Sequence, residues 1–528
     1  MLATIKVYFF KGNYLPFLIG LLSGLYFISF KVVGYSFEYF PGDFIDARFN
    51  NYILEHAYQF FTFQISDYWN APFMFPEKDV ISYSDNLLGT APFYAIFRGI
   101  GFDRETSFQL WYLLITCLNY LSTYILINYV FKNKYAATIG AIIFTFSLAL
   151  QSQMGHAQTF ARFPMIICVL SALKFSEEQN LKWFFWTIFS VVYQLYCGIY
   201  LGLLLLLSAF VLVLSIFIFK RHSILMKIQQ RKWLWSLIGI IIFNACLLLP
   251  LILPYIERAR QLGFYDYKQV VFSILTPLSY FFSWNGSLFW DGLRETCISY
   301  PAFWDHTIFS GALATIGILF FIFILPFYIF KKENKNLPFK LLWITAILTF
   351  LFFIRIERFS FYKILFHLPG YGSMRALQRI INFELLFFAL GLAFLVDYLT
   401  KKKKWIAITI FIILNIAAIA DNYVRDGFIH QRSKIESQGR INLLVERIKF
   451  LPKQSILSYE PDSLLSQSSD YHLDAMLASQ QVGLKCLNGY SATSPGGYGN
   501  YWEKPNAEGR TIWLNRKNQD TTNIVVIH

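Results

Sequence analysis

The densest run of residues that could do chemistry is the segment 41–56, which follows the first long apolar run of the chain. It contains two carboxylates three residues apart, Asp43 and Asp46, with Arg48 close behind them. A carboxylate within hydrogen-bond reach of a hydroxyl can act as a general base. The alternative is structural, because acidic residues are common where a span ends and Asp43 follows Pro-Gly as turn residues do. The segment is therefore a candidate site, and the reaction it could support depends on the side of the membrane on which it lies.

The loop that continues from this segment adds a third carboxylate and several aromatic rings. Asp85 lies in the run 82–89, and the run 68–76 combines a tyrosine, a tryptophan, two phenylalanines and two prolines. The prolines and aromatics predict short helices lying in the membrane interface. Aromatic faces beside carboxylates favour a site for a sugar or a lipid headgroup.

A second constellation consists of two arginines far along the chain. Arg375 and Arg379 are four residues apart and precede an apolar run, so they would face one direction if the segment is helical. Two guanidiniums at a helix N-terminus could cradle a phosphate, or they could simply anchor the helix to lipid headgroups. Glu384 lies one turn further on, where an isolated carboxylate is costly, so we expect it to meet a positive partner.

A third polar patch, residues 151–158, contains His156. A histidine between two apolar runs could act as a base or a ligand, or it could be merely hydrogen-bonded. The sequence leaves both interpretations open.

The elements that would position these residues are membrane helices. Of 528 residues, 56% are hydrophobic and only 15% are charged, far more apolar than an ordinary soluble domain. A helix of about 20 apolar residues crosses a bilayer, and backbone in lipid must satisfy its own hydrogen bonds. We therefore predict an all-α polytopic membrane protein with about eleven transmembrane helices. They are expected near 14–34, 108–131, 136–154, 160–175, 182–198, 199–219, 233–254, 308–330, 339–356, 379–399 and 405–421.

The short loops between these spans indicate the orientation. If the N-terminus is cytoplasmic, every short inside loop is basic, as the positive-inside rule requires. These loops are 132–135, 174–182, 220–232, 331–338 and 400–404. The longer polar segments are then extracytoplasmic, and they are 35–107, 151–159, 257–307, 357–378 and the tail 422–528. Function is expected on that external face, which argues against chemistry on a cytoplasmic nucleotide; we find no glycine-rich phosphate loop either.

The distribution of charge and the positions of the cysteines further restrict the class of protein. The formal net charge is +14, but the basic residues fall in short clusters rather than along one continuous face, which argues against nucleic-acid binding. Only Cys297 and Cys486 lie in external polar segments, where they could pair in an oxidising compartment. The start of the chain is typical of an uncleaved first span rather than a signal peptide.

The tail has the pattern of a small mixed α/β domain. Helical and strand-like stretches alternate there around a turn-rich segment. We expect helices at 434–450 and 471–481, strands at 455–459 and 523–527, and turns at 487–499. The predicted organisation is a transmembrane module over 1–421 and an extracytoplasmic domain over 422–528.

These residues resemble the GT-C superfamily of integral-membrane glycosyltransferases. The segment from Asp46 to Phe49 is similar to the Asp-Glu-x-Arg-Tyr pattern of the aminoarabinose and protein-mannosyl branches, although Ala47 replaces the glutamate. The chain looks closer to a largely uncharacterised bacterial group whose first loop opens with Gly-Asp-x-Arg-x-Asn-x-x-x-Leu-Glu-His. Further motifs of that group are matched by Trp69–Phe73, Tyr83–Gly89 and Asn488–Ser491.

The resemblance implies a GT-C-like fold and an inverting transfer of a hexosyl or pentosyl group from a polyprenyl-phosphate donor. The acceptor would be a hydroxyl of an envelope glycan, a lipid or a protein. Asp46 would be the general base and Asp43 would orient it or the acceptor. Substrate contacts would come from Arg48, Asp85, His156, Arg375 and Arg379. Some relatives use a divalent metal, and Asp43, Asp46 and Asp85 could hold Mg²⁺ or Mn²⁺, although the sequence does not require a metal.

Two other classes remain open. A transporter or flippase of lipid-linked sugars would also explain the spans and arginines, but it should show broken or charged helices at mid-membrane and repeated halves. A non-catalytic protein of envelope assembly would explain the tail but not the acidic loop. The basic inner loops suit a bacterial inner membrane, and a protein of the endoplasmic reticulum would look alike.

Overall fold

The computed structural model describes residues 14–330, 336–401, 403–462, 467–517 and 522–528. Nine helical stretches among them are long and apolar enough to cross a bilayer, so the chain is an integral membrane protein. They are α2 to α3 (Leu15–Val33), α6 (Arg104–Phe131), α7 to η3 (Lys134–Gln153), η4 to α8 (Ala157–Glu178), α10 (Ile199–Phe219), α12 (Arg231–Leu262), α15 to α16 (Ala312–Ile329), η10 to α19 (Leu377–Thr400) and α20 (Lys404–Asp421).

All eleven expected spans are helical in the structure. Two of them are short: α9 (Leu181–Cys197) and α17 (Leu337–Phe353) have 17 residues each. The division of 182–219 into two helices is confirmed, since α9 and α10 are separated by Gly198. Whether α9 and α17 cross the membrane fully stays a prediction.

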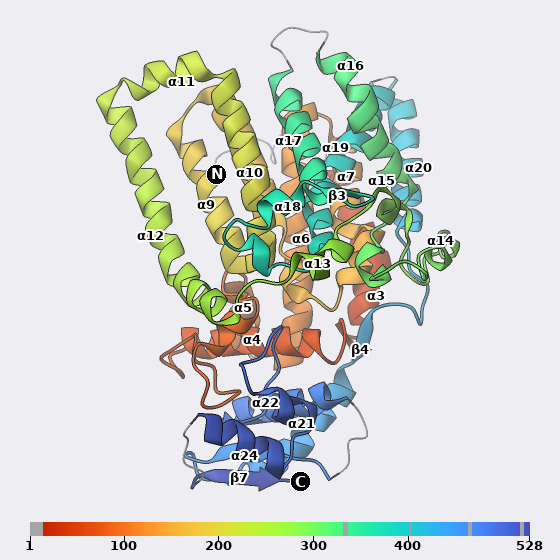
Figure 1. The fold of residues 1–528 in the computed structure, drawn as a ribbon. Helices are drawn as coiled ribbons and strands as arrows, with labels where there is room; N and C mark the ends of the chain where they lie inside the picture. Colours follow the sequence, from red (N-terminus) through yellow and green to blue (C-terminus); the bar gives the residue numbers. More distant parts are fainter. Residues whose placement is uncertain (1–13, 331–335, 402, 463–466, 518–521) are drawn as a thin grey trace.

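The centre of the bundle is built on close helix approaches. The helix α7 (Lys134–Phe146) is almost wholly buried and packs against α6 and α19 (Ile381–Thr400). Where α15 (Ala312–Leu319) meets α19, a Cβ on Gly391 would lie 1.9 Å from the carbonyl oxygen of Gly317. Small residues permit such backbone contact between membrane helices. In contrast, α12 stands at the edge of the bundle with few buried residues (Figure 1).

The first loop and the tail lie at one end of the bundle, where α4 (Asp46–Phe61) runs between the membrane helices and the tail (Figure 1). The strand β1 (Tyr39–Pro41) pairs antiparallel with β4 (Gln431–Ser433), with Tyr39 opposite Ser433. This pairing ties the first loop to the segment that follows the last span. The remaining short elements are η2 (Val80–Tyr83), α5 (Ala91–Ile100), α11 (Arg221–Ile228), α13 (Tyr267–Val270), η5 (Val271–Ser273), η6 (Pro277–Phe281), α14 (Gly292–Glu295), η7 (Phe303–His306), β2 (Arg355–Ile356), β3 (Phe359–Ser360), α18 (Tyr362–Leu365) and η9 (Tyr371–Ser373).

The tail folds as an α/β unit that is continuous with the first loop. Its parallel sheet has the strand order β6-β5-β7. Buried side chains of the loop, such as Phe49 and Phe73, share one hydrophobic core with Leu473 and Trp513 of the tail. The boundary at 421/422 therefore stays a prediction. The tail elements are α21 (Lys434–Ile448), β5 (Ile456–Tyr459), α22 (Ser468–Val482), β6 (Lys485–Cys486), α23 (Gly499–Glu503), α24 (Ala507–Arg516) and β7 (Ile524–Ile527).

The structure tests two expectations about side-chain partners, one for a pair of cysteines and one for Glu384. Cys297 and Cys486 are both free and buried rather than paired. Glu384 is fully buried, but the expectation of a positive partner is wrong, because it accepts a hydrogen bond from the Tyr280 hydroxyl at 2.8 Å. A neutral donor from the segment between α12 and α15 takes the place of a cation.

Candidate active site

The first carboxylate of the candidate site shapes the backbone around the second. Oδ1 of Asp43 accepts hydrogen bonds from the backbone N–H groups of Ile45 and Ala47, both at 3.1 Å. Asp43 thus satisfies donors that are orphaned at the start of α4. Gly42 has a φ of +101°, and a Cβ there would lie 2.9 Å from the carbonyl oxygen of Met154. Asp43 therefore has a structural role, because it stabilises the backbone at the start of α4. Its other oxygen, Oδ2, faces Gly155.

Asp46, the first residue of α4, is held between two side chains from distant parts of the chain. Its Oδ2 lies 2.8 Å from Nδ1 of His156, and its Oδ1 accepts a hydrogen bond from the hydroxyl of Tyr490. The side chains of Asp46 and His156 are 26% and 33% exposed, so a substrate can reach them. The sequence placed Asp46 and His156 on the same side of the membrane, and the structure brings them into contact.

The surroundings of Asp46 favour its ionised form. Burial by itself raises the pKa of this carboxyl and is the largest single influence, whereas the hydrogen bond and the charge of His156 lower it. The Tyr490 hydroxyl and the positive charge of Arg379 add to the same effect, and the pKa of Asp46 falls below its ordinary value. Asp46 is therefore a carboxylate at neutral pH, as a proton acceptor must be.

Asp85 has the opposite environment. It is buried, and the backbone N–H of Tyr200 at the start of α10 points to its Oδ1 at 3.4 Å. Burial raises the pKa of Asp85, and the positive charge of Arg379 only partly opposes that rise. Asp85 thus lies near Arg379, deeper than Asp46 and at a helix N-terminus.

The two arginines of the second constellation do not share a helical face. The 3₁₀ turn η10 (Leu377–Ile380) begins only after Arg375, so Arg375 is exposed whereas Arg379 is 8% exposed. The expectation of a shared helical direction is therefore wrong. The Tyr200 hydroxyl accepts hydrogen bonds from the backbone N–H groups of Arg375 and Ala376, at 2.6 and 3.1 Å, and these bonds stabilise the non-helical segment.

The positive charge of Arg379 nevertheless acts on the candidate site. Its guanidinium lies over the ring of Tyr200, 4.6 Å from the centroid. Its charge lowers the pKa of Asp46, yet no carboxylate among the described residues lies within ion-pair distance of it, and its Nε has no hydrogen-bond partner. Arg375 acts in the same region, because its charge opposes the rise in the pKa of Tyr490 that burial causes.

Arg48 is directed away from this group of residues. It is buried and forms an ion pair of 2.5 Å with Asp474 of the tail, which Arg440 also contacts at 2.7 Å. In the structure Arg48 joins the first loop to α22, so its expected role in substrate binding has no geometric support. A buried pair of this kind is strongly destabilising to break.

Three further residues near Asp46 were not singled out from the sequence. Tyr490 lies in the motif 488–491, Tyr200 lies in an apolar run, and His430 follows the last span. His430 is stacked on Trp284 with ring centroids 6.0 Å apart, and burial lowers its pKa although Asp43 opposes the shift. Tyr200 and His430 could have been found only by their position near the end of a span, whereas Tyr490 lies in a motif that the sequence analysis had quoted. We define the Asp46 cluster as Asp43, Asp46, Asp85, His156, Tyr200, Arg375, Arg379, His430 and Tyr490.

The carboxylates do not form an evident metal site. Within the part of the chain that the structure describes, no group of three His, Cys, Asp or Glu side chains is arranged to hold a metal ion. Asp43 and Asp85 both accept from backbone N–H groups, while Asp46 is engaged by Tyr490 and His156. A site for Mg²⁺ or Mn²⁺ between these carboxylates therefore stays a prediction.

The fold and these residues define an integral membrane protein with a cluster of charged and polar side chains at the end of its helix bundle that faces the tail. No protein-family model matches the chain, and no curated protein matches it.

Solved structures with a related arrangement come from Archaeoglobus fulgidus. The oligosaccharyltransferase in complex with zinc and sulfate has a TM-score of 0.48 and 14% identity, over 92% of this chain and 64% of that one. The oligosaccharyltransferase AglB in complex with an inhibitory peptide and a dolichol-phosphate also scores 0.48 with 14% identity, over 95% and 68% of the two chains. This chain thus spans 64% of the length of the first of them.

Proposed function

We propose that the chain is an inverting membrane glycosyltransferase of the GT-C type. It moves a hexosyl or pentosyl group from a polyprenyl-phosphate donor to a hydroxyl of an envelope glycan, a lipid or a protein. The observation that carries the proposal is the ionised, partly exposed Asp46 in the field of Arg379, which is buried and has no carboxylate partner among the described residues.

Asp46 is the general base of this reaction. As the acceptor oxygen attacks the anomeric carbon, the acceptor proton passes to the Asp46 carboxylate. The bond between the anomeric carbon and the phosphate oxygen breaks, and its electron pair leaves with the polyprenyl phosphate. One in-line displacement inverts the sugar centre. A base of this kind contributes about 10²–10⁴-fold to the rate.

His156 and Tyr490 position the base. They contact different oxygens of Asp46, so the carboxylate plane is fixed while lone pairs remain for the acceptor, because an ionised carboxylate has about four acceptor positions. Both residues also favour the ionised form.

Arg379, with Arg375, stabilises the leaving phosphate. Its guanidinium has free donors and no carboxylate partner among the described residues, and charge that develops on a phosphate is stabilised most by donors already in place. The ring of Tyr200 below Arg379 restricts the guanidinium to one orientation. A donor that cannot leave the bilayer would present its phosphate at this level of the bundle.

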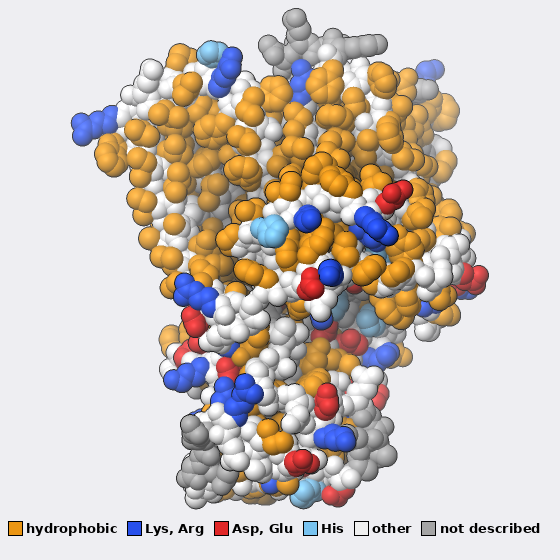
Figure 2. Space-filling model, viewed as in Figure 1, with side chains coloured by type: hydrophobic (Ala, Val, Ile, Leu, Met, Phe, Trp, Pro, Cys, Tyr) orange, Lys and Arg blue, Asp and Glu red, His pale blue; other side chains and the backbone are white. Residues whose placement is uncertain are grey.

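The proposed location is a bacterial inner membrane with the tail outside. The face in Figure 2 supports this orientation, because its charged side chains at the end remote from the tail are Lys and Arg, whereas acidic and basic side chains are mixed on the half nearer the tail. The lipid-linked donor would be reached from the membrane and the acceptor from the external side.

The test is turnover of radiolabelled polyprenyl-phosphate sugars in membranes containing wild-type or Asp46→Asn protein. The substitution keeps the shape and an acceptor for Tyr490 but removes the base, so turnover should fall about 10²–10⁴-fold at equal protein level. Asp462→Asn is the matched control, because that side chain is 89% exposed in the tail, and it should retain wild-type turnover.

Two outcomes would contradict the proposal. One is full turnover by Asp46→Asn. The other is no wild-type turnover across a panel of donors, in which case movement of the intact lipid-linked sugar across vesicles would favour a flippase.

A further inference from the structure

A loop between two membrane helices carries His156, which contacts Asp46. It joins α7 to α8 (Phe163–Glu178) and contains the 3₁₀ turns η3 (Leu148–Gln153) and η4 (Ala157–Thr159). We call residues 147–162 the α7–α8 loop. Arg379, the proposed ligand of the leaving phosphate, belongs to η10, which directly precedes α19. Contacts between the loop and α19 therefore decide how His156 and Arg379 lie relative to each other.

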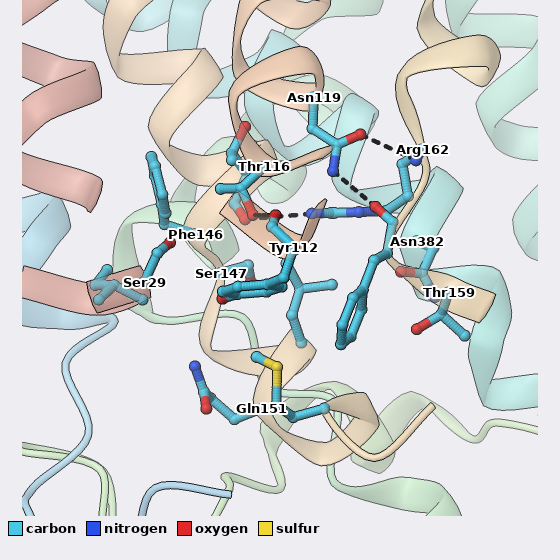
Figure 3. Close-up of a pocket in the computed structure, with 15 residues that line it drawn as sticks. Ser29, Tyr112, Thr116, Asn119, Phe146, Ser147, Gln151, Thr159, Arg162 and Asn382 are labelled. Carbon is cyan, nitrogen blue, oxygen red and sulfur yellow. Dashed lines mark hydrogen bonds between the residues drawn. The ribbon is translucent and has the colours of Figure 1, made fainter. Parts of the chain in front are cut away.

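Arg162 closes the base of the α7–α8 loop. Its Nη1 donates to the carbonyl oxygen of Phe144 at 2.6 Å and its Nη2 to that of Thr145 at 3.2 Å, so the start of α8 is bonded to the end of α7. Its backbone N–H donates to Oδ1 of Asn119 in α6 at 2.9 Å. Figure 3 shows Asn119 bonded to Arg162, with Asn382 of α19 on the wall of the same small cavity. Hydrogen bonds from a charged donor are among the strong ones, so the two ends of the loop are held together.

One buried amide pair connects the loop to α19. The side-chain nitrogen of Asn382 donates to Oε1 of Gln153 at 2.7 Å, although 229 positions separate the two residues. The same nitrogen donates to the carbonyl oxygen of Arg379 at 2.9 Å, as an amide with two N–H donors can. Asn382 is fully buried and Gln153 is 2% exposed, so neither side chain is placed to touch a substrate. The amide of Asn382 thus joins the loop to the backbone of Arg379.

On the other side of this pair, Gln153 is bonded to the turn that ends at His156. The carbonyl oxygen of Gln153 accepts from the backbone N–H of His156 at 2.9 Å, and Nδ1 of His156 lies 2.8 Å from Oδ2 of Asp46. The turn packs on the start of α4 as well, since a Cβ on Gly155 would lie 3.2 Å from Oδ2 of Asp43. The series of contacts between the proposed phosphate ligand and the proposed base is therefore unbroken, and it consists of Arg379, Asn382, Gln153, His156 and Asp46.

Other bonds of the loop to the bundle lie near its two ends. At its beginning, the backbone N–H of Leu148 donates to Oδ1 of Asn422 at 2.8 Å. At its end, the carbonyl oxygen of Ala161 accepts from Nε2 of Gln194 at 2.9 Å. Gln153 lies between these two points, so the amide pair supports the middle of the loop, next to the turn that contacts α4.

We infer that Gln153 and Asn382 are positioning residues of the proposed transfer reaction. Their amide pair holds the loop that carries His156 at a set distance from Arg379, so that the base and the phosphate ligand act on one bound donor and acceptor. Each residue acts through a neighbour and not on the substrate. The inference rests on the proposed function and extends it from the reacting groups to the residues that align them. Such alignment matters because a misplacement of about 1 Å can cost about 10²-fold in rate.

Gln153→Met tests the inference, because it removes the acceptor at nearly constant volume. The backbone bond to His156 and the bond of Asn382 to Arg379 remain, so the variant loses the connection between loop and helix alone. The assay uses purified full-length protein in detergent and a radiolabelled polyprenyl-phosphate sugar that the wild type turns over. We expect kcat per folded protein to fall about 10- to 100-fold with KM unchanged, as for an interaction that serves the transition state and not substrate binding.

Asn382→Leu removes the same bond from the other side, together with the bond to Arg379. It should lower kcat at least as much as Gln153→Met, again at constant KM. The double variant should be no slower than Asn382→Leu, because that change has already broken the shared bond. Independent, multiplicative losses in the double variant would contradict a shared role.

Thr349→Val is the matched control, because it removes a buried hydrogen bond of 3.0 Å to Ser208, between α17 and α10. It should keep the wild-type kcat. The inference alone is overturned if the wild type turns over the donor and Gln153→Met keeps its kcat, or if KM rises in place of a fall in kcat. An equal loss in Thr349→Val would also overturn it, since the cause would then be general destabilisation. Absence of turnover by the wild type across the donor panel would overturn the proposed function and this inference with it.

Discussion

At the scale of residues, Asp46 owes its properties to partners that are remote in sequence. His156 and Tyr490 contact its two oxygens, and Arg379 supplies positive charge nearby. The neighbouring Asp43 is occupied by backbone N–H groups of α4. Of the two carboxylates, Asp46 is thus the one with exposed oxygens in a cationic environment.

His156→Ala should move the acidic limb of the pH–rate profile to higher pH. Burial raises the pKa of Asp46, and His156 is the strongest influence that lowers it. Without His156 the pKa rises, so a higher pH is needed to ionise the base. Initial rates measured across a pH series in wild-type and variant membranes would show the shift.

His367→Ala provides the comparison, because His367 is an exposed histidine in an external loop. Its profile should coincide with the wild-type profile. A His156→Ala limb that stays in place would mean that Asp46 does not control the rate.

At the scale of elements, the bundle depends on a few backbone contacts between helices. The approach of α15 to α19 leaves no room for a methyl group at Gly391, because the nearest atom is a backbone oxygen that cannot rotate away. Interiors packed this closely respond to added volume with backbone shifts.

Gly391→Ala should therefore destabilise the protein by about 1–3 kcal/mol, the usual cost of overpacking. The measurement is the thermal midpoint of the purified protein in detergent. Gly239→Ala in α12 is the control, since a Cβ there meets nothing within 4 Å. It should be neutral or stabilising, because alanine favours a helix over glycine. Equal midpoints for both variants would contradict the packing argument.

At the scale of the whole molecule, the first loop and the tail form one body at one end of the bundle. They share a hydrophobic core, the β1–β4 pairing and the ion pair between Arg48 and Asp474. Through this body the tail delivers Tyr490 to Asp46. The proposed chemistry therefore requires the tail and the first loop to lie on the same side of the membrane.

Alkaline phosphatase fused after His528 should be active in a bacterial host, because the enzyme needs the oxidising external compartment. A fusion after Gln229, in the basic loop that follows α11, should be inactive, and green fluorescent protein fused there should fluoresce. The reverse pattern would invert the orientation and place the Asp46 cluster in the cytoplasm.

The sequence by itself determined the membrane helices and their approximate ends. A run of about 20 apolar residues must become a helix in lipid whatever its neighbours are. The tail helices and strands could also be predicted, because apolar residues recur along them with the period of a helix or a strand, as in α21 and β5. Candidate residues were found from side-chain type and position at the ends of spans.

Only the tertiary structure decided which of these residues meet. Tyr490 lies 444 residues after Asp46, and local patterns carry no information about such a contact. Arg48 and Asp46 are separated by one residue, yet one points to Asp474 and the other to His156. The direction of each side chain follows from how α4 packs between the bundle and the tail, which is a property of the assembled core rather than of the segment.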